Sequence, residues 1–205
     1  MTQKTLIFLG PSGCGKGTQV KLVKEYLESL PGALPVAHLV MGDLFRAMWK
    51  EGVGYSFDLS RDINDRGGLQ PAFMQVRLWT QFFVDSLNGN EHLIIDGSPR
   101  RIEDAILMES AFDFYGMEKP TMVFIDTDIE ESKKRMFHRA HIEGRKDDLL
   151  LANVESRMAW YKEFVVPAID HFRNKDKFGF VTINGNGSIE EVFSEIKQKV
   201  FNDNN

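Results

Sequence analysis

A glycine-rich stretch near the amino terminus most constrains what this 205-residue chain can fold into. Residues 10–18 read Gly-Pro-Ser-Gly-Cys-Gly-Lys-Gly-Thr and directly follow an apolar run that predicts a buried strand. After the turn, Val20, Val23 and Leu27 recur at spacings of three and four, which predicts a helix. Such a turn directs backbone N–H groups and a helix N-terminus at an anion, and Lys16 adds a mobile positive charge. The stretch predicts a polyphosphate-binding loop, with a plain glycine-rich turn as the weaker alternative.

Short apolar runs alternate with helical periodicity along the rest of the chain. Strands are predicted at residues 5–9, 36–40, 92–96, 122–125 and 178–183. Helices are predicted from the loop to Pro31-Gly32 and at 70–87, 102–115, 129–138, 149–174 and 189–201. This alternation is typical of an α/β domain with a parallel five-stranded sheet and helices on both faces. Ligands of such domains bind beyond the carboxyl ends of the strands.

Two segments exceed a minimal α/β core. Residues 42–68 read as two short helices, at 42–51 and 55–64, with glycines at their ends. Residues 138–148 form a charged stretch that resembles a hairpin. Excursions from a rigid core often carry binding functions. We therefore expect a clamp at 42–68 and a lid at 138–148 on a core made of 1–41, 69–137 and 149–205.

Several arginines lie where a phosphate ligand would need them. Six fall at expected strand ends, or in or near the charged stretch: Arg46, Arg100, Arg135, Arg139, Arg145 and Arg157. Any one of them is most simply a solvated surface residue. Together they suit two polyanions, because guanidinium groups bind phosphate oxygens in bidentate fashion.

A carboxylate ends the expected strand at 92–96. Asp96 would lie beside the phosphate loop and could hold Mg²⁺ directly or through water. A turn or helix-capping aspartate is the alternative.

Composition excludes several other classes of protein. Net charge is −5, with 30 acidic and 25 basic residues, which argues against a nonspecific nucleic-acid surface. The single cysteine, Cys14, excludes an internal disulfide and a cysteine-based zinc site, and it is either a reactive thiol or a core residue. No apolar run approaches membrane-spanning length, and no signal peptide precedes the first strand. We expect a cytoplasmic protein without a membrane partner.

These motifs together resemble the adenylate kinase family of nucleoside monophosphate (NMP) kinases. The likeness spans nearly the whole chain and is carried by residues 10–19, 42–46, 68–71, 96–100, 144–148, Arg135 with Arg139, and Arg157 with Tyr161. It implies a P-loop kinase core, an NMP-binding insertion at 42–68 and a short lid at 138–148 without structural zinc. The implied reaction is reversible, Mg²⁺-dependent transfer of the ATP γ-phosphoryl group to AMP by a monomer.

The resemblance also implies two groups of binding residues. ATP would be bound by Ser12, Gly13, Cys14, Gly15, Lys16, Gly17, Thr18, Arg135, Arg139 and Gly187. AMP would be bound by Met41, Arg46, Gly68, Leu69, Gln70, Gly97, Arg100, Asp104, Arg145 and Arg157. The catalytic group would be Lys16, Arg100, Arg135, Arg139, Arg145 and Arg157, with Asp96 on the metal.

Departures from the family pattern concern the base of the acceptor. Val40-Met41 stands where AMP-specific members usually have Ser-Thr, Ser98 where they have Phe, and Asp104 where they have Gln. An ionised Asp104 could only accept hydrogen bonds and would oppose the N1 lone pair of adenine. From the resemblance we expect AMP to be the preferred acceptor, with UMP, CMP or GMP as the alternatives.

Two functions of other classes remain. A GTPase would need Asn-Lys-x-Asp, but Asn174-Lys175-Asp176 places its acid one position early. A non-catalytic nucleotide-binding module would have no need of Arg46, Arg100 and Arg157.

Overall fold

The computed structural model describes residues 2–143 and 150–201 and shows five parallel strands in the order β2-β3-β1-β4-β5. The strands are β1 (Thr5–Leu9), β2 (Val36–Val40), β3 (His92–Asp96), β4 (Thr121–Asp126) and β5 (Gly179–Asn184). Their register pairs Val40 with Asp96 and Phe8 with Val123. The predicted α/β class and parallel five-stranded sheet are confirmed.

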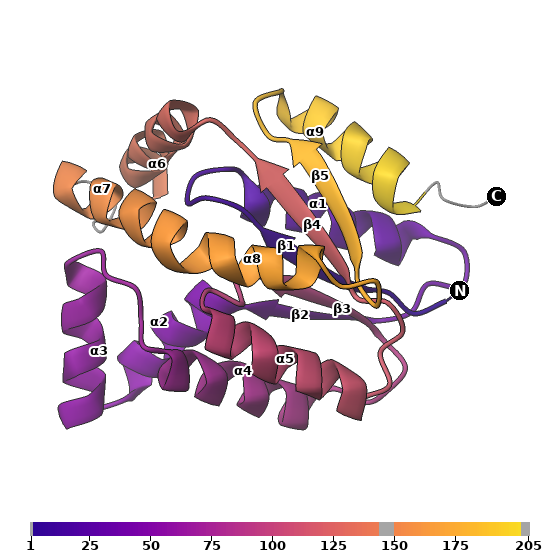
Figure 1. The fold of residues 1–205 in the computed structure, drawn as a ribbon, viewed down its shortest axis with the longest axis horizontal. Helices are drawn as coiled ribbons and strands as arrows, with labels where there is room; N and C mark the ends of the chain where they lie inside the picture. Colours follow the sequence, from indigo (N-terminus) through magenta and orange to yellow (C-terminus); the bar gives the residue numbers. More distant parts are fainter. Residues whose placement is uncertain (1, 144–149, 202–205) are drawn as a thin grey trace.

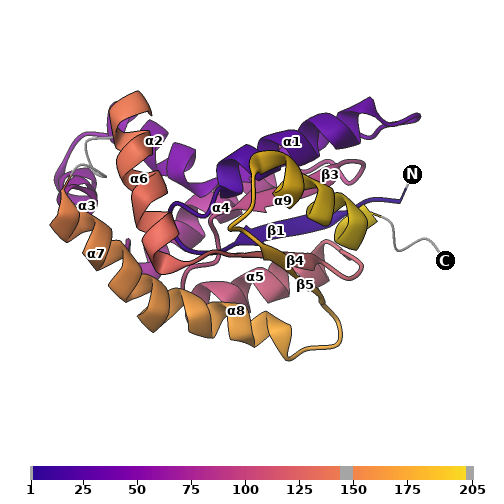
Figure 2. The ribbon, with the colours of Figure 1, turned by 90° about the horizontal axis from the view of Figure 1, so that it is seen from above.

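Helices cover both faces of this sheet. They are α1 (Lys16–Ser29), α2 (Met41–Glu51), α3 (Tyr55–Asp65), α4 (Ala72–Ser86), α5 (Ile102–Phe114), α6 (Ile129–Glu143), α7 (Leu151–Trp160), α8 (Val166–Arg173) and α9 (Ile189–Ile196), with π-helical turns η2 (Tyr161–Val165) and η3 (Lys197–Phe201). Figure 1 shows α1 and α9 on one face and α4, α5 and α8 on the other. In both views α3, α6 and α7 gather at one end of the sheet, the end toward which β4 and β5 point (Figures 1 and 2).

The alternation of side chains along β1 divides the core into two clusters. Leu6 and Phe8 pack in the cluster that contains the buried side of α1 and α9, whereas Ile7 and Leu9 belong to the cluster of α4, α5 and α8. Successive residues of a strand point to opposite faces, so a strand covered on both faces must be apolar throughout. The burial of both faces holds the carboxyl ends of the strands in fixed positions.

The long helix predicted at 149–174 is observed without a break from Leu151 to Arg173, and it contains a π-helical turn that the sequence did not predict. It consists of α7, the π-helical turn η2 and α8, with Pro167 in the first turn of α8. Proline has no backbone N–H to donate to the preceding turn, and a π-helical turn accommodates that missing bond.

The hairpin expected at the start of the lid is also wrong, because α6 continues to Glu143. Met136 and Ala140 are four residues apart and both buried, so the packed side of the helix extends past the predicted end at residue 138. The other lid residues, including Arg145, lie outside the described residues. Among the described residues, no helix has the length and apolar character needed to span a membrane.

Candidate functional site

The glycine-rich loop joins β1 to α1 and is enclosed by α6. Gly13 has a φ of +86°, and a Cβ there would lie 2.2 Å from the backbone oxygen of Ser132 on α6. Only glycine permits this left-handed conformation and this close approach without displacement of the helix. Arg135, one turn further along α6, donates from Nη1 to the oxygen of Gly185 at 2.8 Å and from Nε to Glu131 at 2.9 Å. It lies near Gly15, since a Cβ on Gly15 would be 3.9 Å from Nη1.

Lys16 extends back over the loop that precedes it. Its Nζ donates to the backbone oxygens of Gly10 and Pro11, both at 2.9 Å, and to the sulfur of Cys14 at 3.4 Å. The Cys14 side chain itself is buried in the cluster under α1 and α9, which favours the core interpretation of this thiol. The ammonium group is therefore held at the mouth of the loop by main-chain oxygens that bear no net charge.

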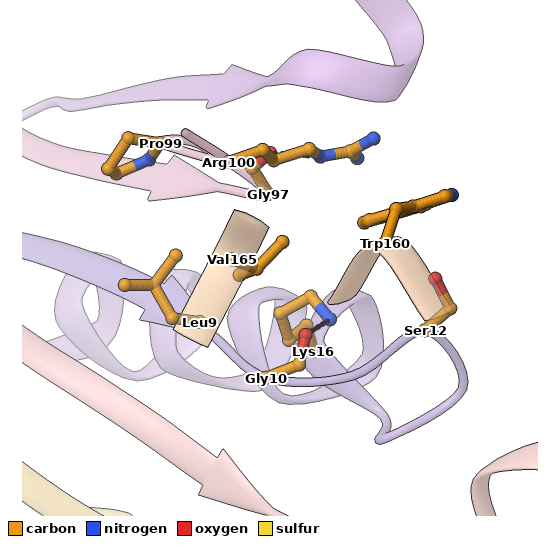
Figure 3. A pocket seen from close by; sticks show the side chains of 9 residues that line it. All are labelled: Leu9, Gly10, Ser12, Lys16, Gly97, Pro99, Arg100, Trp160 and Val165. Atoms are coloured by element: carbon orange, nitrogen blue, oxygen red, sulfur yellow. Dashed lines mark hydrogen bonds between the residues drawn. The ribbon is translucent and has the colours of Figure 1, made fainter. Parts of the chain in front are cut away.

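A small cavity separates the loop from the residues that follow β3. It is lined by Leu9, Gly10, Ser12, Lys16, Gly97, Pro99, Arg100, Trp160 and Val165, and Figure 3 shows these side chains. Its volume is about 30 Å³, which is room for about two water molecules. The structure thus brings Ser12, Lys16, Gly97 and Arg100 together, and a nucleotide would have to part the cavity walls.

Arg100 is the best-defined cation of the site. Its Nε donates to the oxygen of Gly97 at 2.7 Å, and its guanidinium carbon lies 5.6 Å from the centre of the Trp160 ring. Burial, with the nearby positive charge of Arg157 and Arg46, lowers the pKa of the Arg100 guanidinium to about 10. The guanidinium therefore remains charged at neutral pH. Arg46, Arg100 and Arg157 come from separate elements and lie close enough for their charges to interact.

The remaining cations differ in how they are held. Arg46 forms an ion pair with Asp43 on the same turn of α2, and about half of its side chain is exposed. Arg139 lies one helical turn beyond Arg135 on α6 and is half-buried.

Asp96 ends β3 beside the amino-terminal turn of α1. Its Oδ2 would lie 3.8 Å from a Cβ on Gly17, so the carboxylate faces the start of that helix. Burial raises the pKa of the Asp96 carboxyl, and the nearby charges of Lys16 and Arg100 oppose this shift. The exposed Thr18 belongs to the same helical turn as Gly17. These oxygens suit Mg²⁺, which binds through one or two protein oxygens and completes its shell with water and substrate phosphates. No cluster of three or more acidic, histidine or cysteine ligands occurs in the described part of the chain.

The predicted position of Asp104 at the acceptor base is wrong. Its side chain is fully buried, and Oδ1 accepts a hydrogen bond from Trp79 Nε1 at 2.6 Å. Oδ2 accepts from Ser98 Oγ at 3.1 Å and from the backbone N–H of Arg100 at 3.0 Å. Both oxygens are therefore used to fix the turn after β3. The hydrogen bond from Trp79, a residue of α4, holds the carboxylate in the core.

Two more residues expected at the acceptor nucleotide have internal roles. Met41 is completely buried in the core cluster between the sheet and α4. Gln70 donates from Nε2 to the backbone oxygen of Ser60 at 2.8 Å and accepts from Ser60 Oγ at 2.9 Å. Trp49 Nε1 donates to the same hydroxyl at 2.8 Å. These bonds tie α2 and α3 to the start of α4, so the Gln70 side chain holds the clamp together.

Four of the residues predicted to bind nucleotide lie in loops between helices and strands. Gly68 and Leu69 lie between α3 and α4, Gly97 follows β3, and Gly187 follows β5. Arg135 contacts the loop of Gly187 through Gly185.

Sequence reasoning missed Trp160 as a lining residue of the cavity. It lies three residues after Arg157 on α7, one turn along the same side of the helix, and that spacing was the available signal.

Comparison with known proteins shows the family to which this chain belongs. The family model described as adenylate kinase matches residues 8–177. The chain is 32% identical over 200 residues to an adenylate kinase of Leptospira biflexa, covering 96% of this chain and 100% of that protein. It is 30% identical to an adenylate kinase of Parabacteroides distasonis, covering 96% and 97%. It is 29% identical to a uridylate kinase of Saccharomyces cerevisiae, covering 97% and 91%. With its phosphate loop, its converging arginines and this family match, the chain belongs to the adenylate kinase family and is a nucleoside monophosphate phosphotransferase.

Proposed function

We propose that this enzyme transfers the γ-phosphoryl group of ATP reversibly to AMP and yields two ADP. The single observation that supports this best is the shared cavity: Lys16 of the glycine-rich loop and Arg100 of the β3 turn line opposite sides of it. A loop that binds a triphosphate and a cation that binds a second phosphate are thereby separated by one small space. That arrangement aligns a donor and an acceptor, whereas simple nucleotide binding needs the loop alone.

The residues act by alignment and by neutralising charge. The acceptor is a phosphate that is already anionic, so the reaction needs no general base. Lys16 exchanges its main-chain oxygens for phosphate oxygens, and its flexible side chain follows the charge that moves from donor to acceptor. Arg100, Arg46 and Arg157 hold the acceptor phosphate, and Arg135 with Arg139 attends ATP. Exclusion of water by the closed site protects ATP from hydrolysis.

Mg²⁺ fits the residues beside the loop. Asp96 would hold it, directly or through water, together with the hydroxyl of Thr18. When bound, the ion supplies charge neutralisation at the β- and γ-phosphates. The raised pKa of Asp96 agrees with this role, because a buried carboxylate gains most from a nearby cation.

The observations on the acceptor nucleotide point in two directions, to AMP and to another nucleoside monophosphate. The adenylate kinase names of two of the relatives described above favour AMP. The internal bonding of Asp104 removes the negative charge that would have opposed adenine N1, whereas a relative named uridylate kinase favours the alternative. We commit to AMP.

A coupled assay tests this proposal. Purified enzyme is given ATP, Mg²⁺ and, in turn, AMP, GMP, CMP or UMP, and kcat/KM is determined for each acceptor. We expect the highest value with AMP, loss of turnover with excess EDTA and recovery on addition of Mg²⁺. A higher kcat/KM for another acceptor would overturn the AMP assignment, and no phosphoryl transfer to any acceptor would overturn the reaction itself. Light scattering of the same sample tests the expected monomer.

A further inference from the structure

Trp160 lies at the end of α7, where it contacts two parts of the site that are far apart in sequence. Its indole Nε1 donates a hydrogen bond to the backbone oxygen of Gly67 at 3.0 Å. Gly67 lies directly between the clamp helix α3 and the core helix α4. The other contact is the guanidinium of Arg100, 5.6 Å from the ring centre, which is within the range of a cation–π interaction.

The Gly67 carbonyl is a junction between the clamp and α7. Ser156 Oγ donates to the same oxygen at 3.3 Å, so both of its lone pairs have partners on α7. One turn earlier on α7, Asn153 Nδ2 donates to the oxygen of Asp65 at 3.1 Å. Side chains of α7 therefore hold the point at which the clamp returns to the core.

The contact with Arg100 has a particular chemical advantage. The positive charges of Arg157 and Arg46 repel Arg100, and they contribute to its lowered pKa. The face of an indole attracts a guanidinium without using its N–H donors, which stay available for phosphate oxygens. Trp160 thus fixes the position of Arg100 at no cost in hydrogen-bonding capacity. Figure 3 shows both side chains at the cavity that Lys16 also lines.

We propose that Trp160 is a positioning residue that couples the clamp to Arg100, so that the acceptor phosphate and the clamp stabilise one another. When the clamp packs against α7, the Gly67 carbonyl fixes the position of the Trp160 indole, and the indole in turn fixes the position of the Arg100 guanidinium. The inference rests on the proposed function in assigning Arg100 to the acceptor. It predicts an effect on the acceptor substrate that leaves ATP binding unchanged, because the hydrogen bond and the cation–π contact of Trp160 go to Gly67 and Arg100 on the acceptor side of the cavity.

Three variants separate the two contacts. Trp160→Phe keeps an aromatic face for Arg100 and loses the bond to Gly67, Trp160→Leu loses both, and Ser156→Ala removes only a bond to Gly67. We expect KM for the acceptor to rise about 3-fold in Trp160→Phe and about 10- to 30-fold in Trp160→Leu. In Ser156→Ala the rise should stay below about 3-fold. KM for ATP should remain within about 2-fold of wild type throughout. Thermal melting of each variant checks that it is folded.

A double-mutant cycle makes the coupling measurable. Arg100→Lys and Trp160→Leu are combined, and the loss in kcat/KM for the acceptor should be at least about 3-fold smaller than the product of the single losses. Multiplicative losses would overturn the coupling, as would an equal rise of both KM values in Trp160→Leu. An absence of activity in the wild type would overturn the proposed function instead. In that case isothermal titration decides: the Kd for AMP should be higher in Trp160→Leu than in the wild type, and an unchanged Kd would overturn the inference.

Discussion

Replacement of Asp104 by asparagine distinguishes a buried structural carboxylate from one that reads the acceptor base. Asparagine has the same shape, and its oxygen can still accept from Trp79 Nε1, which now lies 2.6 Å from Oδ1. Its amide nitrogen would replace Oδ2, which accepts from Ser98 and from the Arg100 N–H. The Ser98 hydroxyl can rotate to accept instead, but the Arg100 N–H cannot and loses its acceptor.

The size of the effect follows from that lost acceptor. A buried N–H without a partner costs about 1–3 kcal/mol. Removal of the carboxylate charge offsets part of this cost, because burial raises the pKa of Asp104 and so disfavours its ionised form. We expect Asp104→Asn to lower the free energy of unfolding by about 1–2 kcal/mol, and Tm by about 2–8 °C for a chain of this size.

The effect on activity should be the same for every acceptor. A loosened turn at Arg100 lowers kcat/KM by about 10-fold for AMP, GMP, CMP and UMP alike, since the turn positions the phosphate and not the base. Differential scanning fluorimetry and the coupled assay measure the two effects, and Ser98→Ala is the matched control that keeps the carboxylate. A change of more than about 3-fold in the relative kcat/KM of the four acceptors would refute the reasoning, because it would show that Asp104 contacts the base.

Three further changes test other parts of the site and fold. Lys16→Met should lower kcat by about 10²- to 10³-fold without unfolding the protein, because it removes a charge aimed at the moving phosphoryl group; turnover near wild type in a coupled assay would contradict this. Gly13→Ala should lower stability by about 2 kcal/mol or more, since the new Cβ would lie 2.2 Å from the Ser132 oxygen, and an unchanged Tm would contradict that packing. Burial by itself raises the pKa of the Glu109 carboxyl. Hydrogen bonds from Lys175, Lys177 and His171 outweigh that effect, and the pKa falls from 4.5 to about 2. The ionised carboxylate therefore contributes to stability above pH 4.5, and this contribution is lost as the pH falls toward 2. The free energy of unfolding in urea should decline less over that pH range in Glu109→Gln than in the wild type, and an equal decline in both proteins would disprove this.

Local signals in the sequence were sufficient for most of the fold. The bounds of β1, β2 and β3 match the predicted strands residue for residue, because each is a short run made mostly of apolar residues. The ends of the helices were less predictable. Helix α6 runs to Glu143, since packing of Ala140 outweighs the charged sequence around it.

The roles of the polar side chains divide in the same way. The glycine-rich loop and Lys16 are adjacent in sequence, and the phosphate binding proposed for them depends on glycine geometry and on a helix N-terminus, so the sequence alone was enough to predict it. Arg46 and Arg100 were predictable as neighbours, because each follows a parallel strand and all such ends meet at one edge.

Asp104 and Trp160 depended on tertiary structure. A carboxylate that follows a strand can face either a ligand or the core. For Asp104 the partner is Trp79, 25 residues away, whose indole N–H donates to the carboxylate inside the molecule. Trp160 acquires its role from Gly67, 93 residues away, and from Arg100. Contacts between such distant residues exist only once the helices have packed, and no local pattern of hydrophobicity or turn residues encodes them. The sequence by itself thus predicted the glycine-rich loop with its lysine, and only the packing of α4 and α7 decided which side chains contact Arg100 and its turn.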